Sequence, residues 1–291
     1  MPFPYLSETH TLDADARVAL PGDFVQLSDG FTHYELIGSS DCPTVVLVHG
    51  FSVPYFIWQP TVEFLVQAGY RVLCYDLYGR GFSDRPRKRY DLDLFNRQLV
   101  ELLDVLEFQT PFGLVGLSMG GIIASNFVCR HPERVSKLGL VDPAGFSISR
   151  TWYFNLILLP GLGELIFGLF GDSNLLKSMA SDFYDPQQVE YFLSRYRPQM
   201  RYQGFKRALL STLRAGMLED QSAIYGQLGQ IKTPVQLIWG RHDTTVPYEY
   251  SADLMQMVPR AEFHTIEGAG HIPHYEKPEV VNPLLLEFLR S

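Results

Sequence analysis

The sequence predicts an α/β fold with a mostly parallel central sheet flanked by helices. Short apolar runs rich in Val, Ile and Leu recur along the 291 residues. Most of these runs are continuous rather than alternating, which is typical of strands buried on both faces. Helical patterns lie between the runs, and regular alternation of strand and helix favours a parallel sheet.

The individual elements can be placed from these patterns. Residues 23–37 alternate in polarity around Ser28-Asp29-Gly30, which predicts a hairpin. Strands are then expected at Thr44–Val48, Arg71–Tyr75, Phe112–Leu117, Lys137–Val141, Pro234–Trp239 and Glu262–Ile266. Helices are expected at about 55–68, 91–108, 119–130, 248–257 and 278–290.

The alternation breaks at residues 146–230, where helical spacing continues without strand character. We therefore expect a core domain made of 1–145 and 231–291, with 146–230 inserted as a helical lid. Aromatic side chains of this insertion could line an apolar pocket: Trp152, Tyr153, Phe154, Phe167, Phe170, Phe183, Tyr184, Tyr191 and Phe192. Its most apolar stretch, 156–170, is short and interrupted by Pro160, so no transmembrane segment is expected.

Composition excludes several classes of function. The formal net charge is -8, and the one basic cluster, residues 85–89, is interpreted as a solvated loop, so no nucleic-acid partner is expected. The three cysteines are widely spaced, which fits a reducing compartment. The first residues do not resemble a signal peptide, and we expect a cytoplasmic protein. The oligomeric state is left open.

The stretch Gly116-Leu117-Ser118-Met119-Gly120 fits the pattern G-x-S-x-G. It follows an expected strand and opens an expected helix, which is the context of a nucleophile turn. Glycines allow close approach of the chain there, and the helix N-terminus favours a developing negative charge. The alternative is a serine that only caps the helix. We predict that Ser118 is a catalytic nucleophile.

A serine nucleophile needs a base, and the base needs an acid to orient it. His271 follows the last expected strand and is the favoured base, with His274 as its competitor. Asp243 follows the strand before it and is the favoured acid. Asp142 could also serve, although a structural role before Pro143 is the preferred interpretation. The remaining histidines are less suitably placed: His10, His33, His49, His131, His242 and His264.

The chain order Ser118, Asp243, His271 resembles that of the α/β-hydrolase superfamily. Supporting stretches are His49-Gly50-Phe51 after one strand, the loop at 76–84 after the next, and residues 240–247. The resemblance covers nearly the whole chain. It implies an oxyanion hole formed by the backbone N–H groups of Phe51 and Met119.

Other chemistry has no motif to support it. The chain lacks the glycine patterns of dinucleotide and phosphate loops, and it lacks paired metal-ligand spacings, so no cofactor and no metal are expected.

A serine at the turn favours acyl transfer. We predict a carboxylesterase or monoacylglycerol-lipase-like enzyme that acts on a small-molecule ester with an apolar acyl or alcohol group. Two alternatives remain. Carbon–carbon bond hydrolases resemble the chain at Ser118-Met119-Gly120-Gly121, although a tryptophan commonly follows the catalytic Gly-His of that family and Ile272 stands here. Some relatives of the same fold are ligand receptors.

Overall fold

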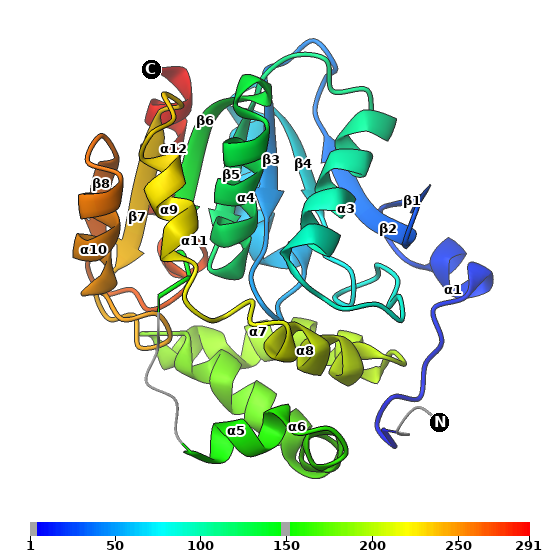
Figure 1. Cartoon of the computed structure of the whole chain (residues 1–291). Coiled ribbons are helices and arrows are strands. Elements are labelled where there is room, and N and C mark those ends of the chain that lie inside the picture. Colours follow the sequence, from blue (N-terminus) through cyan, green and yellow to red (C-terminus); the bar gives the residue numbers. More distant parts are fainter. Residues whose placement is uncertain (1–4, 147–151) are drawn as a thin grey trace.

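The structure is a computed structural model that describes residues 5–146 and 152–291 (Figure 1). Its sheet has eight strands in the order β1-β2-β4-β3-β5-β6-β7-β8. From β4 to β8 neighbouring strands run parallel, whereas β1 and β2 pair antiparallel to each other and β2 pairs antiparallel to β4. The predicted fold class is therefore confirmed.

The strands fall close to the expected positions. The hairpin forms β1 (Asp23–Leu27) and β2 (Gly30–Ile37), and its turn lies at Ser28-Asp29. The remaining strands are β3 (Thr44–Val48), β4 (Arg71–Tyr75), β5 (Phe112–Leu117), β6 (Val135–Val141), β7 (Val235–Gly240) and β8 (Glu262–Ile266). The largest difference from the expected bounds is at the start of β6, which begins two residues earlier than predicted. Its first two residues extend the pairing with β5 beyond the apolar run.

Helices cover both faces of the sheet. On one face α3 (Leu92–Val105), α4 (Met119–Arg130), α9 (Ser222–Leu228) and α10 (Tyr250–Met257) pack in a row. On the other face α2 (Gln59–Gln67), α11 (Pro273–Glu276) and α12 (Pro278–Arg290) pack together. Single 3-10 turns precede α2 and β6, at Tyr55–Trp58 and Pro132–Arg134.

Alternate residues of the central strands enter opposite cores. In β3, Val46 and Val48 join the core beneath α3 and α4, whereas Val45 and Leu47 join the core beneath α2 and α12. All four side chains are fully buried. Burial on both faces explains why these strands appear in the sequence as continuous apolar runs.

The segment between β6 and β7 is helical. It contains α5 (Trp152–Leu158), α6 (Leu162–Ser181), α7 (Val189–Tyr196), α8 (Phe205–Arg214) and α9, with short 3-10 turns at Pro186–Gln188 and Arg197–Arg201. Helices α5 to α8 pack on one another and lie together at one end of the sheet, whereas α9 packs on α4 and α10 (Figure 1). The segment therefore divides between a separate helical layer and the face of the sheet.

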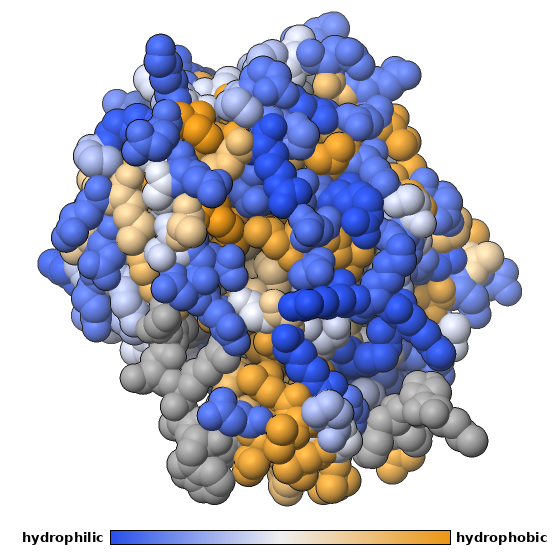
Figure 2. All heavy atoms as spheres, viewed as in Figure 1, coloured by the Kyte–Doolittle hydropathy of each residue, from blue (hydrophilic) through white to orange (hydrophobic). Residues whose placement is uncertain are grey.

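Exposed apolar side chains gather on the outer side of α6 and of the turn that precedes it (Figure 2). They are Leu159, Leu162, Leu165, Leu169 and Phe170. At the start of the described chain, the short helix α1 (Ala14–Ala19) precedes β1. None of the helices described is both long and apolar enough to cross a membrane.

Candidate active site

Ser118 occupies the turn between β5 and α4, and its backbone is strained. It has φ 53° and ψ -121°, a region that residues with a side chain rarely adopt. Among the described residues, the non-glycine residues with positive φ are Ser118, Asp142 and Glu107, so two of the three border this site. The Ser118 side chain does not cap the helix. The strained turn instead holds the side chain at the cavity described below.

Three glycines make the turn possible by close packing of backbone. A β-carbon on Gly116 would lie 2.4 Å from the carbonyl oxygen of Gly120. A β-carbon on Gly120 would lie 2.3 Å from the carbonyl oxygen of Val48, and one on Gly121 would meet Pro143 at 2.8 Å. The spacing G-x-S-x-G is thus explained by contact between the start of α4 and the ends of β3 and β5.

His271 and Asp243 form a buried pair. The Nδ1–H of His271 donates to Oδ2 of Asp243 at 2.8 Å, while Oδ1 of Asp243 accepts from the backbone N–H groups of Thr245 (2.8 Å) and Val246 (2.9 Å). Burial alone would lower the pKa of His271, but the charge and hydrogen bond of Asp243 outweigh it and raise that pKa above its usual 6.5. The paired carboxylate therefore stabilises the protonated ring.

The loops carrying this pair approach each other through glycines. A β-carbon on Gly240, at the end of β7, would lie 1.9 Å from the carbonyl oxygen of Gly270. The competitor His274 is instead fully buried, its ring packs on that of Trp58 at 4.2 Å between centroids, and burial lowers its pKa to about 3. His274 is a packed core residue.

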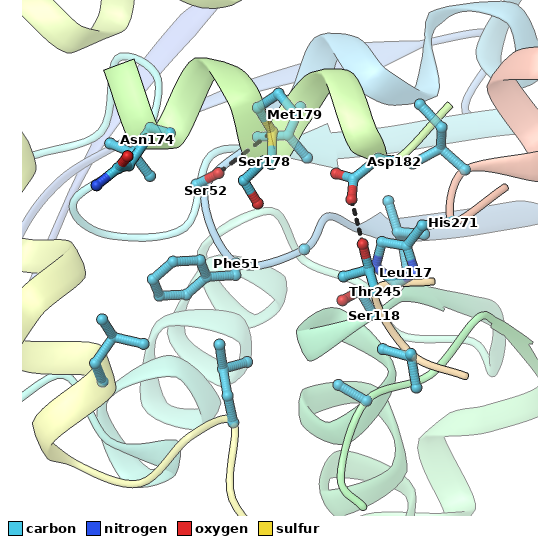
Figure 3. A pocket seen from close by; sticks show the side chains of 18 of the residues that line it. Phe51, Ser52, Leu117, Ser118, Asn174, Ser178, Met179, Asp182, Thr245 and His271 are labelled. Atoms are coloured by element: carbon cyan, nitrogen blue, oxygen red, sulfur yellow. Dashed lines mark hydrogen bonds between the residues drawn. The ribbon is translucent and has the colours of Figure 1, made fainter. Parts of the chain in front are cut away.

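Ser118 and His271 open into the same cavity, which has a volume of about 300 Å³ (Figure 3). No hydrogen bond joins the hydroxyl of Ser118 to the His271 ring in the part of the chain described, and such contacts often tighten only with substrate bound. The walls are mainly apolar and include Phe51, Phe146, Phe154, Phe167, Leu213 and Ile272. Polar side chains reach the cavity from α6 and from two loops: Ser52, Asn174, Ser178, Asp182 and Thr245.

The aromatic residues expected in the pocket divide into groups. Phe154 and Phe167 line the cavity, whereas Phe183 and Phe192 pack in the core beneath the helical segment. Three others are exposed on the outer surface: Phe170, Tyr184 and Tyr191. The side chains of Trp152 and Tyr153 lie outside the described part.

The loop after β3 places Phe51 beside Ser118. A β-carbon on the preceding Gly50 would lie 3.7 Å from Oγ of Ser118, so this backbone passes close to the hydroxyl. Met119 begins α4, and its N–H has no acceptor within the helix. His49 orders the loop: its Nδ1–H donates to the carbonyl of Gly50 and its Nε2 accepts from the N–H of Leu77. Burial lowers the pKa of His49 to about 4, so its ring is neutral.

Two buried side chains hold the carbonyl groups of this loop, and sequence reasoning missed both. Arg80 donates from Nε to the carbonyl of Phe51 at 2.6 Å and from its terminal nitrogens to the carbonyl of Tyr78 and the hydroxyl of Thr212. Gln199, from the helical segment, donates to the carbonyl of Ser52 at 2.9 Å. The one hint in the sequence was an arginine between two glycines, which have φ of 85° and 46°.

Asp182 is a third residue that the sequence did not reveal. It follows α6 and is buried, its carbonyl accepts from the N–H of His271 at 2.8 Å, and its carboxylate accepts from the hydroxyl of Thr245 at 2.6 Å. Burial raises its pKa to about 6, against the opposing effects of His271 and the Thr245 hydrogen bond. The carboxyl group of Asp182, which comes from the helical segment, therefore contributes to the electrostatic potential at the His271 ring.

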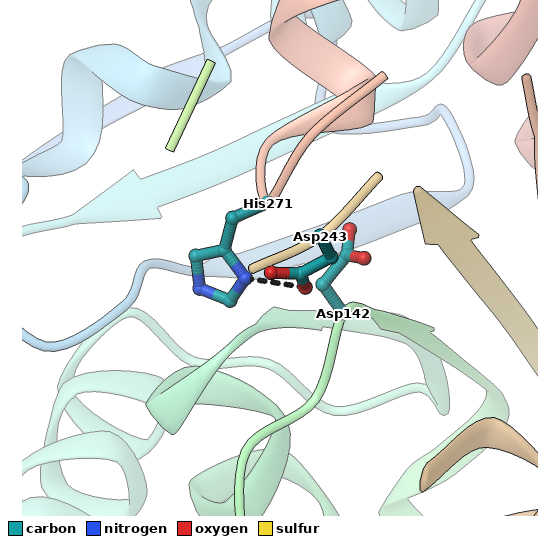
Figure 4. A group of neighbouring side chains, drawn as sticks. All are labelled: Asp142, Asp243 and His271. Carbon is teal, nitrogen blue, oxygen red and sulfur yellow. Dashed lines mark hydrogen bonds and ion pairs between the residues drawn. The ribbon is translucent and has the colours of Figure 1, made fainter. Parts of the chain in front are cut away.

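Among the described residues, one group of three side chains has ligand atoms close enough to hold a metal ion. These side chains are Asp142, Asp243 and His271, but the ligand atoms of the last two are joined by a hydrogen bond (Figure 4). The expectation of no cofactor and no metal stays a prediction.

Comparison with known proteins defines the class of protein. A family model described as the alpha/beta hydrolase fold matches residues 43–278. The chain belongs to the α/β-hydrolase family, as the resemblance predicted, and it is an enzyme of the hydrolase class.

Similar proteins of known name indicate chemistry within that family. A 2-hydroxy-6-oxo-6-phenylhexa-2,4-dienoate hydrolase of Comamonas testosteroni is 31% identical, covering 91% of this chain and 93% of that protein. A 2-hydroxy-6-oxononadienedioate/2-hydroxy-6-oxononatrienedioate hydrolase of Paraburkholderia phymatum is 33% identical, covering 97% and 98%.

Solved structures agree on the architecture. A meta-cleavage product hydrolase of Pseudomonas fluorescens IP01 aligns with a TM-score of 0.74 and 26% identity, covering 92% of this chain and 97% of that one. An enol-lactonase of Burkholderia xenovorans LB400 aligns with a TM-score of 0.79 over 92% of this chain and 100% of that one, and at 22% identity it shares the fold. The named relatives therefore favour the carbon–carbon alternative over the predicted esterase.

Proposed function

We propose that the protein hydrolyses a bond that joins a carbonyl carbon to a leaving group. Ser118 is the nucleophile, His271 is the base, and Asp243 is the acid that orients His271. The observation that carries this proposal is the strained turn, which presents Ser118 to the cavity that His271, hydrogen-bonded to Asp243, also borders. The N–H groups of Phe51 and Met119 would stabilise the oxyanion.

Each step follows from these positions. His271 takes the proton of Ser118 as Oγ attacks the carbonyl carbon, and the resulting charge on the ring is stabilised by Asp243. The tetrahedral intermediate collapses, the leaving fragment takes the proton from His271, and an acyl-enzyme remains on Ser118. Water, deprotonated by His271, then attacks that ester and releases a carboxylic acid.

For the bond that breaks, we propose the carbon–carbon bond beside a ketone. The support comes from the two named relatives, each more than 30% identical over more than nine-tenths of this chain. In this reaction the electron pair of the broken bond leaves on carbon and is protonated by His271. The products are a carboxylic acid and a shortened carbon skeleton, so one water is consumed.

A carboxylic ester is the second candidate, and one observation favours it. The cavity walls are largely apolar, with aromatic rings from both the sheet domain and α5–α6. Such walls suit an uncharged acyl chain better than a carboxylate, which pays a desolvation penalty among apolar groups.

We also propose that α5 to α8 act as a lid. Residues of α5, α6 and α8 line the cavity, and the support for a separate unit is that these helices pack chiefly on each other. Because α9 packs with the helices of the sheet, the proposed lid ends before it.

The test is turnover of two substrate sets by wild type and Ser118→Ala. One is 2-hydroxy-6-oxo-6-phenylhexa-2,4-dienoate, and the other is a p-nitrophenyl ester series from acetate to palmitate. We expect wild type to consume the dienoate repeatedly and Ser118→Ala to be inactive. Ser125→Ala, which changes a buried serine on α4 that does not line the cavity, is the matched control and should keep its activity.

The outcomes separate the candidates. Turnover of esters alone would assign the second candidate, and the best chain length would measure the acyl pocket. A folded wild type that binds a substrate but completes no more than one turnover would favour a receptor. Undiminished turnover by Ser118→Ala would contradict the mechanism.

A further inference from the structure

Asp142 is a buried acid that the mechanism above does not use. It follows β6, is fully buried and has a strained backbone with φ 41°. Its Oδ1 accepts from the backbone N–H of Gly240 at 2.8 Å. Its Oδ2 is buried as well, and no N–H or O–H group of the described residues donates to it.

The neighbour of that oxygen is the carboxylate of Asp243. One ligand atom each from Asp142, Asp243 and His271 lies within 4.8 Å of the others, and Asp243 stands between the other two (Figure 4). A carboxylate offers about four lone-pair positions. Three positions on Asp243 are filled by His271 and by the N–H groups of Thr245 and Val246, which leaves one open.

Two carboxyl groups that lie side by side in a buried site without water do not both lose their protons. Burial, and next the charge of Asp243, raise the pKa of Asp142 well above its usual range. The other ionisable groups around this pair are His271, Asp182 and Glu276. When Oδ2 of Asp142 carries a proton, it donates a hydrogen bond to the open lone-pair position on Asp243, and no buried oxygen of Asp142 is left without a partner.

We propose that Asp142 is a positioning residue that holds a proton shared with Asp243 and supplies the negative charge beside His271 when Asp243 is neutralised. In an Asp243→Ala protein the repulsion from Asp243 is gone, and burial alone still opposes the ionisation of Asp142. The positive charge that forms on His271 offsets this cost, so Asp142 ionises and stabilises the His271 cation in place of Asp243. This inference rests on the proposed triad and extends it from one acid to two.

A double-mutant comparison tests the proposal without knowledge of the natural substrate. The readout is the rate at which an alkyl fluorophosphonate labels Ser118, followed by intact-protein mass. Removing the acid of a triad that has no second acid costs about 10⁴-fold. We expect Asp243→Ala, which places no amide N–H against the His271 ring, to lose only about 10²-fold. Asp142→Asn should lose about two- to fivefold, because its amide can still form hydrogen bonds with Gly240 and Asp243. The double variant should lose the full factor of about 10⁴.

Controls separate this proposal from the proposed function and from a structural effect. Asp41→Asn makes the same chemical change at an exposed site and should label like wild type. An infrared band of a protonated carboxylic acid at neutral pH should disappear in Asp142→Asn. A double variant that loses no more than the product of the single losses, or an unchanged infrared band, would overturn the shared proton. Labelling of Ser118→Ala at the wild-type rate would instead overturn the triad itself.

Discussion

Replacing Asp182 by Asn should stabilise the protein at neutral pH and not at acidic pH. The carboxyl group is buried next to His271, and burial raises its pKa from an ordinary 3.8 to about 6. A raised pKa means that ionisation of the Asp182 carboxyl group costs more free energy in the folded protein than in the unfolded chain. Asparagine removes this cost and can still accept the hydrogen bond from Thr245.

The magnitude follows from the two pKa values. At about pH 4 the carboxyl group is protonated in the folded protein and partly protonated in the unfolded chain, so the pKa shift contributes only about 0.5 kcal/mol to the difference between variant and wild type. The penalty grows as the pH rises to about 6 and is constant above it. Its full size is about 3 kcal/mol, and relaxation around the site would reduce the measured gain to about 1–3 kcal/mol.

The assay is chemical denaturation of wild type and Asp182→Asn at about pH 4 and about pH 7.5. Because the comparison is between two proteins at each pH, the titration of all other groups cancels to a first approximation. The exposed Asp41→Asn change should show no such dependence. An Asp182→Asn protein that is less stable than wild type at neutral pH, or a difference that is the same at both pH values, would show that ionisation of Asp182 does not destabilise the folded protein.

Three further predictions follow from the site. Gly120→Ala should destabilise the fold by about 1–3 kcal/mol or more in denaturant melts, because its β-carbon meets backbone 2.3 Å away, whereas Gly226→Ala, with open space, should gain about 0.5–1 kcal/mol. Arg80→Lys should lower kcat about tenfold with little change in KM, because lysine cannot bind the three acceptors that fix the Phe51 loop; a change in KM alone would contradict it. As the pH decreases, kcat/KM should fall with an apparent pKa above 6.5, because His271 acts as a base only when its ring is neutral. An apparent pKa below 6.5 would contradict the pairing of His271 with Asp243.

Much of the fold could be predicted because the central strands are buried on both faces. Continuous apolar runs identified β3, β4 and β5 to the residue. The start of β6 could not be found in this way, since the polar Ser136 separates Val135 from the expected strand and only the pairing of Val135 with Phe112 of β5 extends it. Short α11, with Pro273 at its start, follows the His271 loop and gives too few residues for a helical period.

Part of the site could be predicted because its turn has a sequence pattern. Gly116 and Gly120 mark close contacts of backbone, and those contacts leave a spacing that can be recognised. Arg80, Gln199 and Asp182 have no such spacing. Their roles depend on side chains that come together only after the sheet and the helical segment have packed, so their positions in the chain carried no signal.

The role of Ser118 as nucleophile is tested most directly by the intact-protein mass after exposure to an alkyl fluorophosphonate. We expect one phosphonyl adduct on wild type, located at Ser118 by peptide mapping, and none on folded Ser118→Ala. An adduct of equal extent on Ser118→Ala, or no adduct on folded wild type, would contradict it.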